Sequence, residues 1–204
     1  MFLVLLLVSS VASSAGANDS LARLVENRIE LSPELRTAEY ARLSGEMRSL
    51  SRRSAWTGVD RTYMSLVGLN SELAWEDHIL GAQASSELGR ISDTHERLLE
   101  AVRLDPNPEI VDWLWSIDQS YGRVVFVSEP GSLLDAMQVS LDPVERRAVE
   151  FAIASCERMG TFEGLLPAGN YVFDGRPVEV EVGSEIMIDL ASETRQRNRF
   201  GLYR

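Results

Sequence analysis

The stretch from Trp75 to Tyr121 constrains the fold most, because it predicts three consecutive helices joined by tight turns. Gly89 follows the first helix and Pro106 follows the second. Asn107-Pro108 restarts the chain at once, since an N-cap residue before a proline marks a helix start. Small side chains in the first helix would let a neighbouring helix approach closely: Gly81, Ala82, Ala84, Ser85 and Ser86. We expect this stretch to be the core of the chain.

Further helices are predicted on the N-terminal side. Residues 18–50 are expected to be helical in two pieces, and Ser32-Pro33-Glu34 marks the start of the second piece. Another helix is expected over about residues 59–69. Ser71 lies in a cap signature, so we expect the next helix to start there. Ser92 is expected to cap the second helix of the central stretch.

The pattern changes after Gly122. A short strand is predicted over residues 123–127 and a short helix over residues 132–138. Asp142-Pro143-Val144-Glu145 then forms a strong capping box, which opens another helix. Cys156 falls on the apolar face of that helix, so we interpret it as a buried small hydrophobe rather than a reactive thiol.

Three strands are predicted near the C-terminus, over residues 171–173, 178–182 and 186–190. Asp174-Gly175 between the first two is a strong signal for a two-residue hairpin. Three short strands are only marginally stable alone. Their apolar face is therefore expected to cover a helix, or the strands are expected to pair with residues 123–127.

Residues 75–106 resemble a single tetratricopeptide-type helical hairpin. Two helices are joined by a short glycine turn, and four residues fall at the spacing that such repeats use: Ala82, Gly89, Ala101 and Pro106. The sequence departs from the pattern at His78, Gly81 and Ser85, where the first helix of a repeat has large apolar and aromatic residues. No second copy lies about 34 residues up or down the chain. A generic helical hairpin is the alternative.

Residues 166–190 are locally similar to the small β modules of the PEGA and carboxypeptidase-regulatory type. The likeness begins at Leu166-Pro167 and runs through Val182-Gly183, which is only part of such a module. These modules are common in bacterial envelope proteins, and the resemblance implies a place in the envelope.

The first seventeen residues have the pattern of a secretory signal peptide. They carry no charge, contain an apolar run from Phe2 to Val8 and end in Ala15-Gly16-Ala17. This run is too short for a membrane span, which needs about 20 residues. The usual basic residues ahead of it are missing, so either the α-amino group acts alone or the true start lies upstream. We expect a secreted or periplasmic protein without a membrane span.

Composition excludes several kinds of chemistry. All 20 basic residues are arginine, so no lysine can form a Schiff base or bind phosphate in a Walker loop. A single cysteine excludes an internal disulfide, and two histidines exclude a three-histidine zinc site. The net charge of −11 argues against nucleic acid as the main partner.

No metal or cofactor is expected. His95-Glu96 lacks the second histidine of a metalloprotease motif. Helix geometry places His78 too far from His95 for the two to share one ion. The acids around Asp105 resemble calcium ligands, but two prolines interrupt them and the central glycine is absent.

The sequence predicts an α+β fold that is mostly α, with an N-terminal repeat-like antiparallel helical bundle and a small C-terminal antiparallel β-sheet. Four parts are expected. They are a signal peptide (1–17), the helical bundle with the tetratricopeptide-like hairpin (18–121), an α+β part with a three-stranded sheet (122–192) and a basic tail (193–204). The tail holds four arginines and is either a frayed terminus or a segment that docks on an acidic partner.

We expect a non-enzymatic scaffold or adaptor that binds another envelope protein. The candidate partner-binding residues are Trp75, His78, Trp113 and Trp115. One alternative is a carboxylate-based hydrolase acting on envelope glycan, with two carboxylates about 5–10 Å apart. The other is a small-ligand binding protein that uses Trp113 or Trp115.

Overall fold

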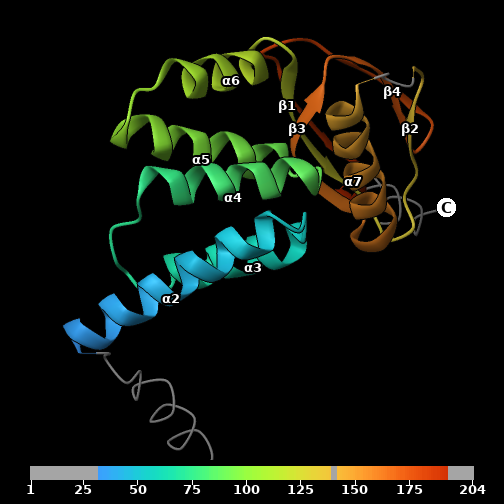
Figure 1. The fold of residues 1–204 in the computed structure, drawn as a ribbon. Helices are drawn as coiled ribbons and strands as arrows, with labels where there is room; N and C mark the ends of the chain where they lie inside the picture. Colours follow the sequence, from blue (N-terminus) through green and yellow to red (C-terminus); the bar gives the residue numbers. More distant parts are fainter. Residues whose placement is uncertain (1–31, 139–141, 193–204) are drawn as a thin grey trace, which may run out of the picture. The chain divides into compact units, whose positions relative to one another are not determined.

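The computed structural model describes residues 32–138 and 142–192. The chain divides into two compact units, Met1–Thr37 and Ala38–Arg204. Within the described part the fold is α+β and mostly α, as predicted (Figure 1). The predicted signal peptide, the first of the two N-terminal helical pieces and the basic tail lie outside the described residues.

The described helices are α2 (Pro33–Ser51), α3 (Trp56–Val67), α4 (Trp75–Glu87), α5 (Ile91–Leu104), α6 (Pro108–Asp118) and α7 (Pro143–Met159). The prediction of three helices between Trp75 and Tyr121 is confirmed by α4, α5 and α6. Helices α4 and α5 form a tightly packed hairpin, and α6 packs against α5 (Figure 1). The three predicted caps that combine a polar side chain with proline are also confirmed. Ser32 accepts from the Leu35 N–H, Asn107 from the Glu109 N–H and Asp142 from the Val144 N–H.

Two glycines explain how closely the helices pack. A Cβ at Gly81 of α4 would lie 2.5 Å from Cδ2 of Tyr63 on α3, so only glycine lets this ring lie on the α4 backbone. Gly89, between α4 and α5, has a φ of +76°, which favours glycine. The same residue lies against the backbone carbonyl of Arg147 in α7. Gly81 thus permits the close contact with α3, and Gly89 permits the close contact with α7.

Two predicted helix starts are wrong. Helix α4 begins at Trp75 and not at Ser71, because Asn70 has a φ of +51° and the Ala74 N–H donates to the Tyr40 hydroxyl at 3.0 Å. Helix α5 begins at Ile91 with Arg90 as its N-cap, so Ser92 does not cap it. The Thr94 N–H donates to the Arg90 carbonyl, which fixes this earlier start.

The strands form two three-stranded sheets rather than the single sheet that was predicted. One sheet has the order β3-β1-β6, formed by Thr161–Pro167, Tyr121–Val127 and Glu185–Asp189. The other has the order β2-β4-β5, formed by Leu134–Ala136, Gly169–Phe173 and Arg176–Val180. The Asp174-Gly175 hairpin is confirmed, with φ values of +47° and +79°.

Strand β6 follows the β4–β5 hairpin in the chain, but it pairs with β1 of the other sheet, and the two strands are parallel. Gly183, with a φ of +67°, turns the chain, and its N–H donates to the Tyr121 carbonyl. The Arg123 N–H then donates to the Ser184 carbonyl. These bonds bring the third predicted strand beside β1, which confirms the expected pairing with residues 123–127, and the two strands run parallel.

The short helix predicted over residues 132–138 is also wrong, because this segment contains strand β2. The Leu133 N–H donates to Oδ1 of Asp174 at 2.8 Å, and the Asp174 N–H donates to the Leu133 carbonyl at 2.8 Å. The hairpin turn therefore holds the segment extended beside β4.

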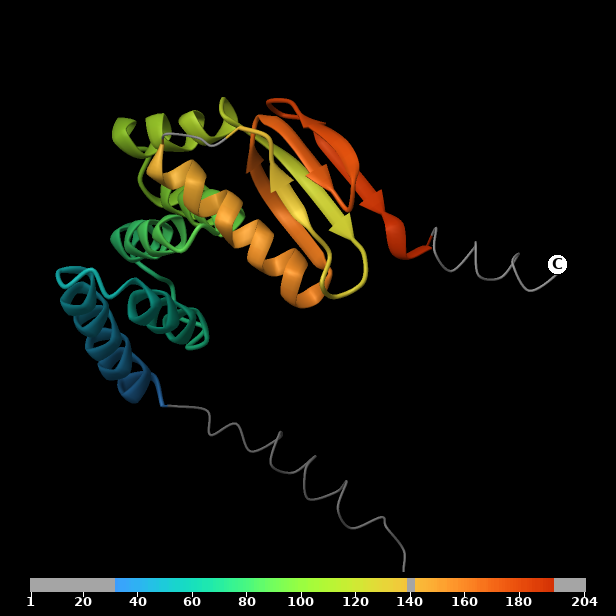
Figure 2. The same cartoon turned by 90° about the vertical axis from the view of Figure 1, so that its right-hand side faces the viewer.

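The inner faces of the two sheets share one core with α7. Phe126 of β1 stacks on Phe173 of β4 with ring centroids 4.7 Å apart. Helix α7 runs along one side of the strands (Figure 2) and contributes Ala152 and Cys156 to this core. Cys156 is fully buried, as predicted, and burial raises the pKa of its thiol to about 11.

Candidate functional site

A groove of about 590 Å³ lies between α3 and α5. We call it the α3–α5 groove. Ligand pockets in proteins usually span about 300–1,000 Å³, so its size suits a ligand or a protein segment. Its lining combines apolar side chains with charges of both signs: Tyr63, Met64, Val67, Arg90, Asp93, Glu96, Arg97, Leu99, Glu100 and Arg103.

A buried arginine forms part of the lining. Arg97 is only 6% exposed, and its Nη1 lies 2.7 Å from the Gly81 carbonyl oxygen and 2.9 Å from Oδ1 of Asp60. Its guanidinium carbon lies 4.2 Å from the centroid of the Tyr63 ring. A buried charge is tolerated only when it is paired and hydrogen-bonded. Arg97 meets this condition and fixes α5 against both α3 and α4.

Arg90 completes a charge cluster at one end of the groove. It forms ion pairs with Asp60 of α3 and, at 3.3 Å, with Asp93 of α5. At the rim, Arg103 pairs with Glu100. The carboxylates of Asp60, Asp93 and Glu100 thus have arginine partners within the chain.

Apolar side chains remain open to solvent between these charges. Met64 is 55% exposed and Val67 is 43% exposed, and both lie on α3 beside the groove. They are one helical turn apart, on the same face of the helix. Leu99, on α5, is half-buried in the same lining. The groove therefore presents an apolar strip bordered by charged residues.

His78 lies behind the groove and supports its lining. Its Nδ1 is 3.0 Å from the hydroxyl oxygen of Tyr63, and the two rings meet edge to face. Burial lowers the pKa of His78. The next residue toward the N-terminus, Asp77, is buried and accepts hydrogen bonds from the hydroxyl groups of Tyr40 and Ser44. These bonds attach α4 to α2 and α3.

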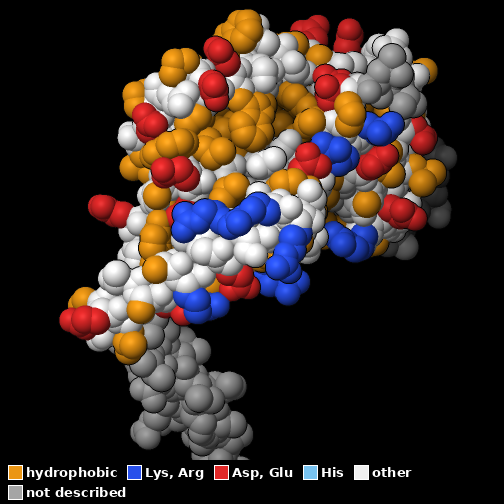
Figure 3. Space-filling model, in the orientation of Figure 1, with side chains coloured by type: hydrophobic (Ala, Val, Ile, Leu, Met, Phe, Trp, Pro, Cys, Tyr) orange, Lys and Arg blue, Asp and Glu red, His pale blue; other side chains and the backbone are white. Residues whose placement is uncertain are grey.

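The structure separates the four predicted partner-binding residues. Trp75 and Trp113 are half-buried and pack against one apolar cluster, at the junction of α4, α5 and α6. Hydrophobic surface is visible between α6 and the α4–α5 hairpin in Figure 3. His78 contacts Tyr63 instead, and Trp115 is 63% exposed on another side of α6, one turn from the exposed Val111. None of the four lines the α3–α5 groove.

Sequence reasoning missed the groove residues on α3. Met64 and Val67 are spaced like residues on one face of a helix, but their spacing does not show whether that face is buried or exposed. Nothing next to Arg97 in the sequence distinguishes it from an exposed helical arginine, because the carbonyl group that it contacts belongs to Gly81, sixteen positions away. The presence of Gly81 in one helix and Tyr63 in the preceding one indicates a close contact only once α3 and α4 are known to pack together.

A second hollow, of about 390 Å³, lies between α5, the end of α6 and the start of β1. His95 and Asp118 face each other there, with Nε2 of the histidine 2.9 Å from Oδ1 of the aspartate. Asp118 is exposed and His95 is half-buried, and Arg123 and Ser184 also line this hollow. The two histidines of the chain thus have different partners, Tyr63 and Asp118.

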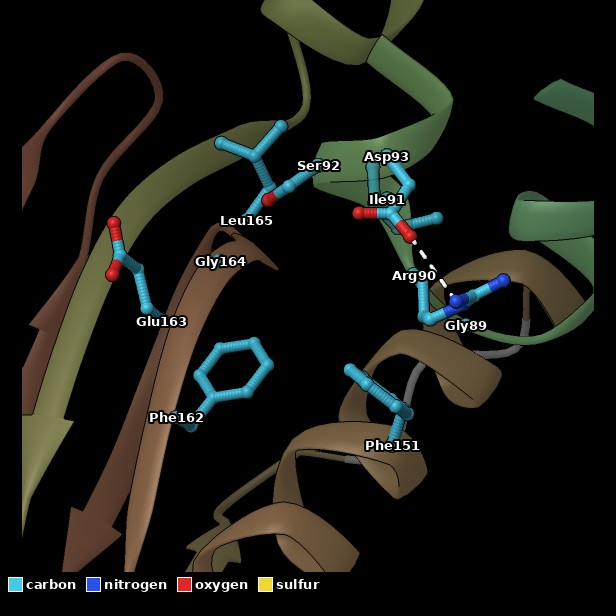
Figure 4. Close-up of a pocket in the computed structure, with 10 residues that line it drawn as sticks. All are labelled: Gly89, Arg90, Ile91, Ser92, Asp93, Phe151, Phe162, Glu163, Gly164 and Leu165. Atoms are coloured by element: carbon cyan, nitrogen blue, oxygen red, sulfur yellow. Dashed lines mark ion pairs between the residues drawn. The ribbon is translucent and has the colours of Figure 1, made fainter. Parts of the chain in front are cut away.

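A third pocket, of about 140 Å³, lies where the start of α5 meets β3 and α7 (Figure 4). Phe151 and Phe162 face each other across it, with ring centroids 6.2 Å apart, and the Arg90–Asp93 ion pair lies at its edge. Its volume is below the usual range for a ligand site. Arg90 and Asp93 also line the α3–α5 groove, so the ion pair separates the two hollows.

Within residues 32–138 and 142–192, no group of three or more histidine, cysteine, aspartate or glutamate side chains could hold a metal ion. None of the helices found there has both the length and the apolar composition that crossing a bilayer requires.

Comparison of the chain with protein-family models, with curated proteins and with solved structures gave no match.

Proposed function

We propose that this protein is a non-enzymatic adaptor that binds a segment of another envelope protein in the α3–α5 groove. The observation that carries the proposal is the exposure of Met64 and Val67 beside a groove of about 590 Å³. Exposed apolar side chains that lie together on a shaped surface mark interaction sites more often than scattered ones do.

The charges of the groove suit a binding site. Asp93 and Glu100 of its lining form ion pairs with arginines of the same chain. Ion pairs at a rim contribute specificity and orientation to a complex, while the apolar centre contributes most of its free energy.

The contacts of the lining support a preformed site. Tyr63 is held by Gly81 below it, by Arg97 over its ring and by His78 at its hydroxyl. A binding surface that is already ordered loses less conformational entropy when a partner binds. The partner would therefore meet a rigid lining rather than one that has to form.

The signal-peptide pattern of residues 1–17 supports a secreted or periplasmic location, and the similarity of residues 166–190 to envelope β modules supports the same compartment. In this proposal the hairpin of α4 and α5, which resembles a tetratricopeptide unit in sequence, is the scaffold that positions the lining of the groove.

The experiment compares capture of envelope proteins by three tagged forms of the chain. These are the unchanged protein, the groove variant Met64→Glu/Val67→Glu and the control Met159→Glu. Met159 is 49% exposed at the end of α7, so its substitution places a negative charge on an exposed apolar residue away from the groove. Circular dichroism establishes that all three forms are folded.

We expect a protein that is captured by the unchanged chain and by the control, and lost with the groove variant. An identical set of captured proteins with all three forms would contradict the proposal. Turnover of glycan by the purified chain would contradict its non-enzymatic part.

A further inference from the structure

The outer face of the β3-β1-β6 sheet is covered at one end, where Leu165 packs against the apolar cluster of α4, α5 and α6, and the described part of the chain leaves the rest of it open. Alternate residues of β1 point into the core, where Val124 and Phe126 are fully buried. The residues between them point the other way. In the middle row Val125 pairs with Glu163 of β3 and with Met187 of β6, so these three share the outer face. Met187 is 71% exposed, the largest exposed fraction among the exposed apolar side chains described.

The charge on this outer face is mainly negative. Arg123 pairs with Glu185 in register and forms an ion pair with Glu163 at 3.0 Å. Asp189 lies at the other end of β6, beside Val127. Three carboxylates thus surround an apolar centre of Val125, Val127 and Met187, and one arginine opposes them.

The chain leaves this face at the end of β6. Asp189 is the last residue of the strand, and its Oδ1 accepts from the Ser192 N–H at 2.9 Å. Twelve residues follow Ser192, with four arginines, one glutamate and the apolar side chains of Phe200, Leu202 and Tyr203. These residues carry a net positive charge, whereas the outer face of the sheet, which they follow at the end of β6, is mainly negative.

We propose that residues 193–204 dock on the outer face of the β3-β1-β6 sheet within the same molecule. The arginines pair with Glu163, Glu185 and Asp189, and the aromatic residues cover Val125 and Met187. Twelve extended residues span up to about 40 Å, whereas the five residues of β6 rise about 17 Å. The segment is therefore long enough to reverse direction and cross the whole face.

The test measures oxidation of Met187 in the full chain by hydroxyl-radical footprinting and mass spectrometry. The test variant is Arg195→Glu/Arg197→Glu/Arg199→Glu, which keeps every described residue. Met159 of α7 serves as the internal reference because it is also exposed but lies on another element.

We expect Met187 to be oxidised roughly fivefold faster in the variant. This ratio follows if residues 193–204 are docked in about four of five molecules of the unchanged chain and protect Met187 while they are docked. Met159 should be oxidised at the same rate in both forms. High salt should also speed oxidation of Met187 in the unchanged chain, because the pairing is electrostatic.

Equal oxidation of Met187 in the two forms would overturn the proposal. Protection that disappears on dilution would also overturn it, since that result would assign the contact to a second copy of the chain. A chain ending at Ser192 provides an independent check, and it should match the charge-reversal variant. Slow oxidation of Met187 in that shorter chain would contradict the assignment of residues 193–204 as the cover.

Discussion

The guanidinium group of Arg97 lies over the ring of Tyr63, with 4.2 Å between its central carbon and the ring centroid. This contact joins α5 to α3 across α4. The same guanidinium reaches the Gly81 carbonyl and Asp60, so one side chain connects three helices. The shape of the α3–α5 groove depends on this connection.

Replacing Arg97 should destabilise the fold. Arg97→Met keeps much of the side-chain volume but removes the positive charge beside Asp60, whose side chain is mostly buried. Removing one partner of a buried ion pair typically costs about 3–5 kcal/mol. Because Arg90 still pairs with Asp60, we expect a loss of about 2–4 kcal/mol in the free energy of unfolding, measured in urea.

Arg103→Ala is the matched control, since Arg103 also lies on α5 but forms an exposed ion pair. Exposed pairs contribute about 0–1 kcal/mol. Equal losses in the free energy of unfolding for the two variants would show that the buried ion pair of Arg97 contributes no more than an exposed one.

Gly81→Ala should be destabilising although alanine is the better helix former. The added Cβ would lie 2.5 Å from Cδ2 of Tyr63, and the ring is held in place by Arg97 and His78. Overpacking of this kind costs about 1–3 kcal/mol. Gly45→Ala is the control, because a Cβ at Gly45 of α2 meets no atom within 4 Å, and we expect it to be neutral or stabilising. A more stable Gly81→Ala variant would contradict the close contact.

Stability should fall as pH decreases below the usual pKa of histidine. Burial lowers the pKa of His78 in the folded chain. The unfolded chain therefore takes up a proton first, at about pH 6.5, and protonation stabilises the unfolded state until the folded histidine also titrates. We expect the melting temperature to drop between pH 7 and pH 5, and to drop less in His78→Asn. An identical pH dependence in both forms would rule out this role of His78.

Cys156 should not react with thiol reagents in the folded protein. Burial raises the pKa of its thiol to about 11, and the side chain has no solvent exposure. At pH 8 we expect labelling by a disulfide reagent only after urea unfolds the chain, with a sharp rise at the unfolding midpoint. Because the chain has one cysteine, the signal has one source. Rapid labelling without urea would contradict the burial of α7 against the sheets.

Local signals in the sequence predicted the elements that local chemistry fixes. Pro108 and Asp142 start helices where caps are strongest, and Asp174-Gly175 turns the hairpin. The sequence did not predict β2 or the parallel pairing of β6, because both depend on hydrogen bonds to residues far along the chain, such as Asp174 to Leu133 and Ser184 to Arg123.

The α3–α5 groove was not predicted from the sequence. Tryptophan and histidine suggested Trp75 and His78, whose role in partner binding stays a prediction, whereas the exposed apolar residues of the groove are Met64 and Val67. Whether a helical apolar residue faces a neighbour or solvent depends on where the next helices pack. That packing is set by Gly81 and Arg97, whose contacts with Tyr63 cannot be recognised from spacing alone.

Site-specific photo-crosslinking from Val67 identifies what occupies the α3–α5 groove in the cell. A photoreactive phenylalanine analogue at Val67 should crosslink the chain to one envelope protein in living cells, while the same analogue at Met159 should not. The crosslink from position 67 should disappear when Met64→Glu is added. A crosslink of equal yield from both positions, or none from position 67 while position 159 yields one, would contradict the assignment of the α3–α5 groove as the binding site.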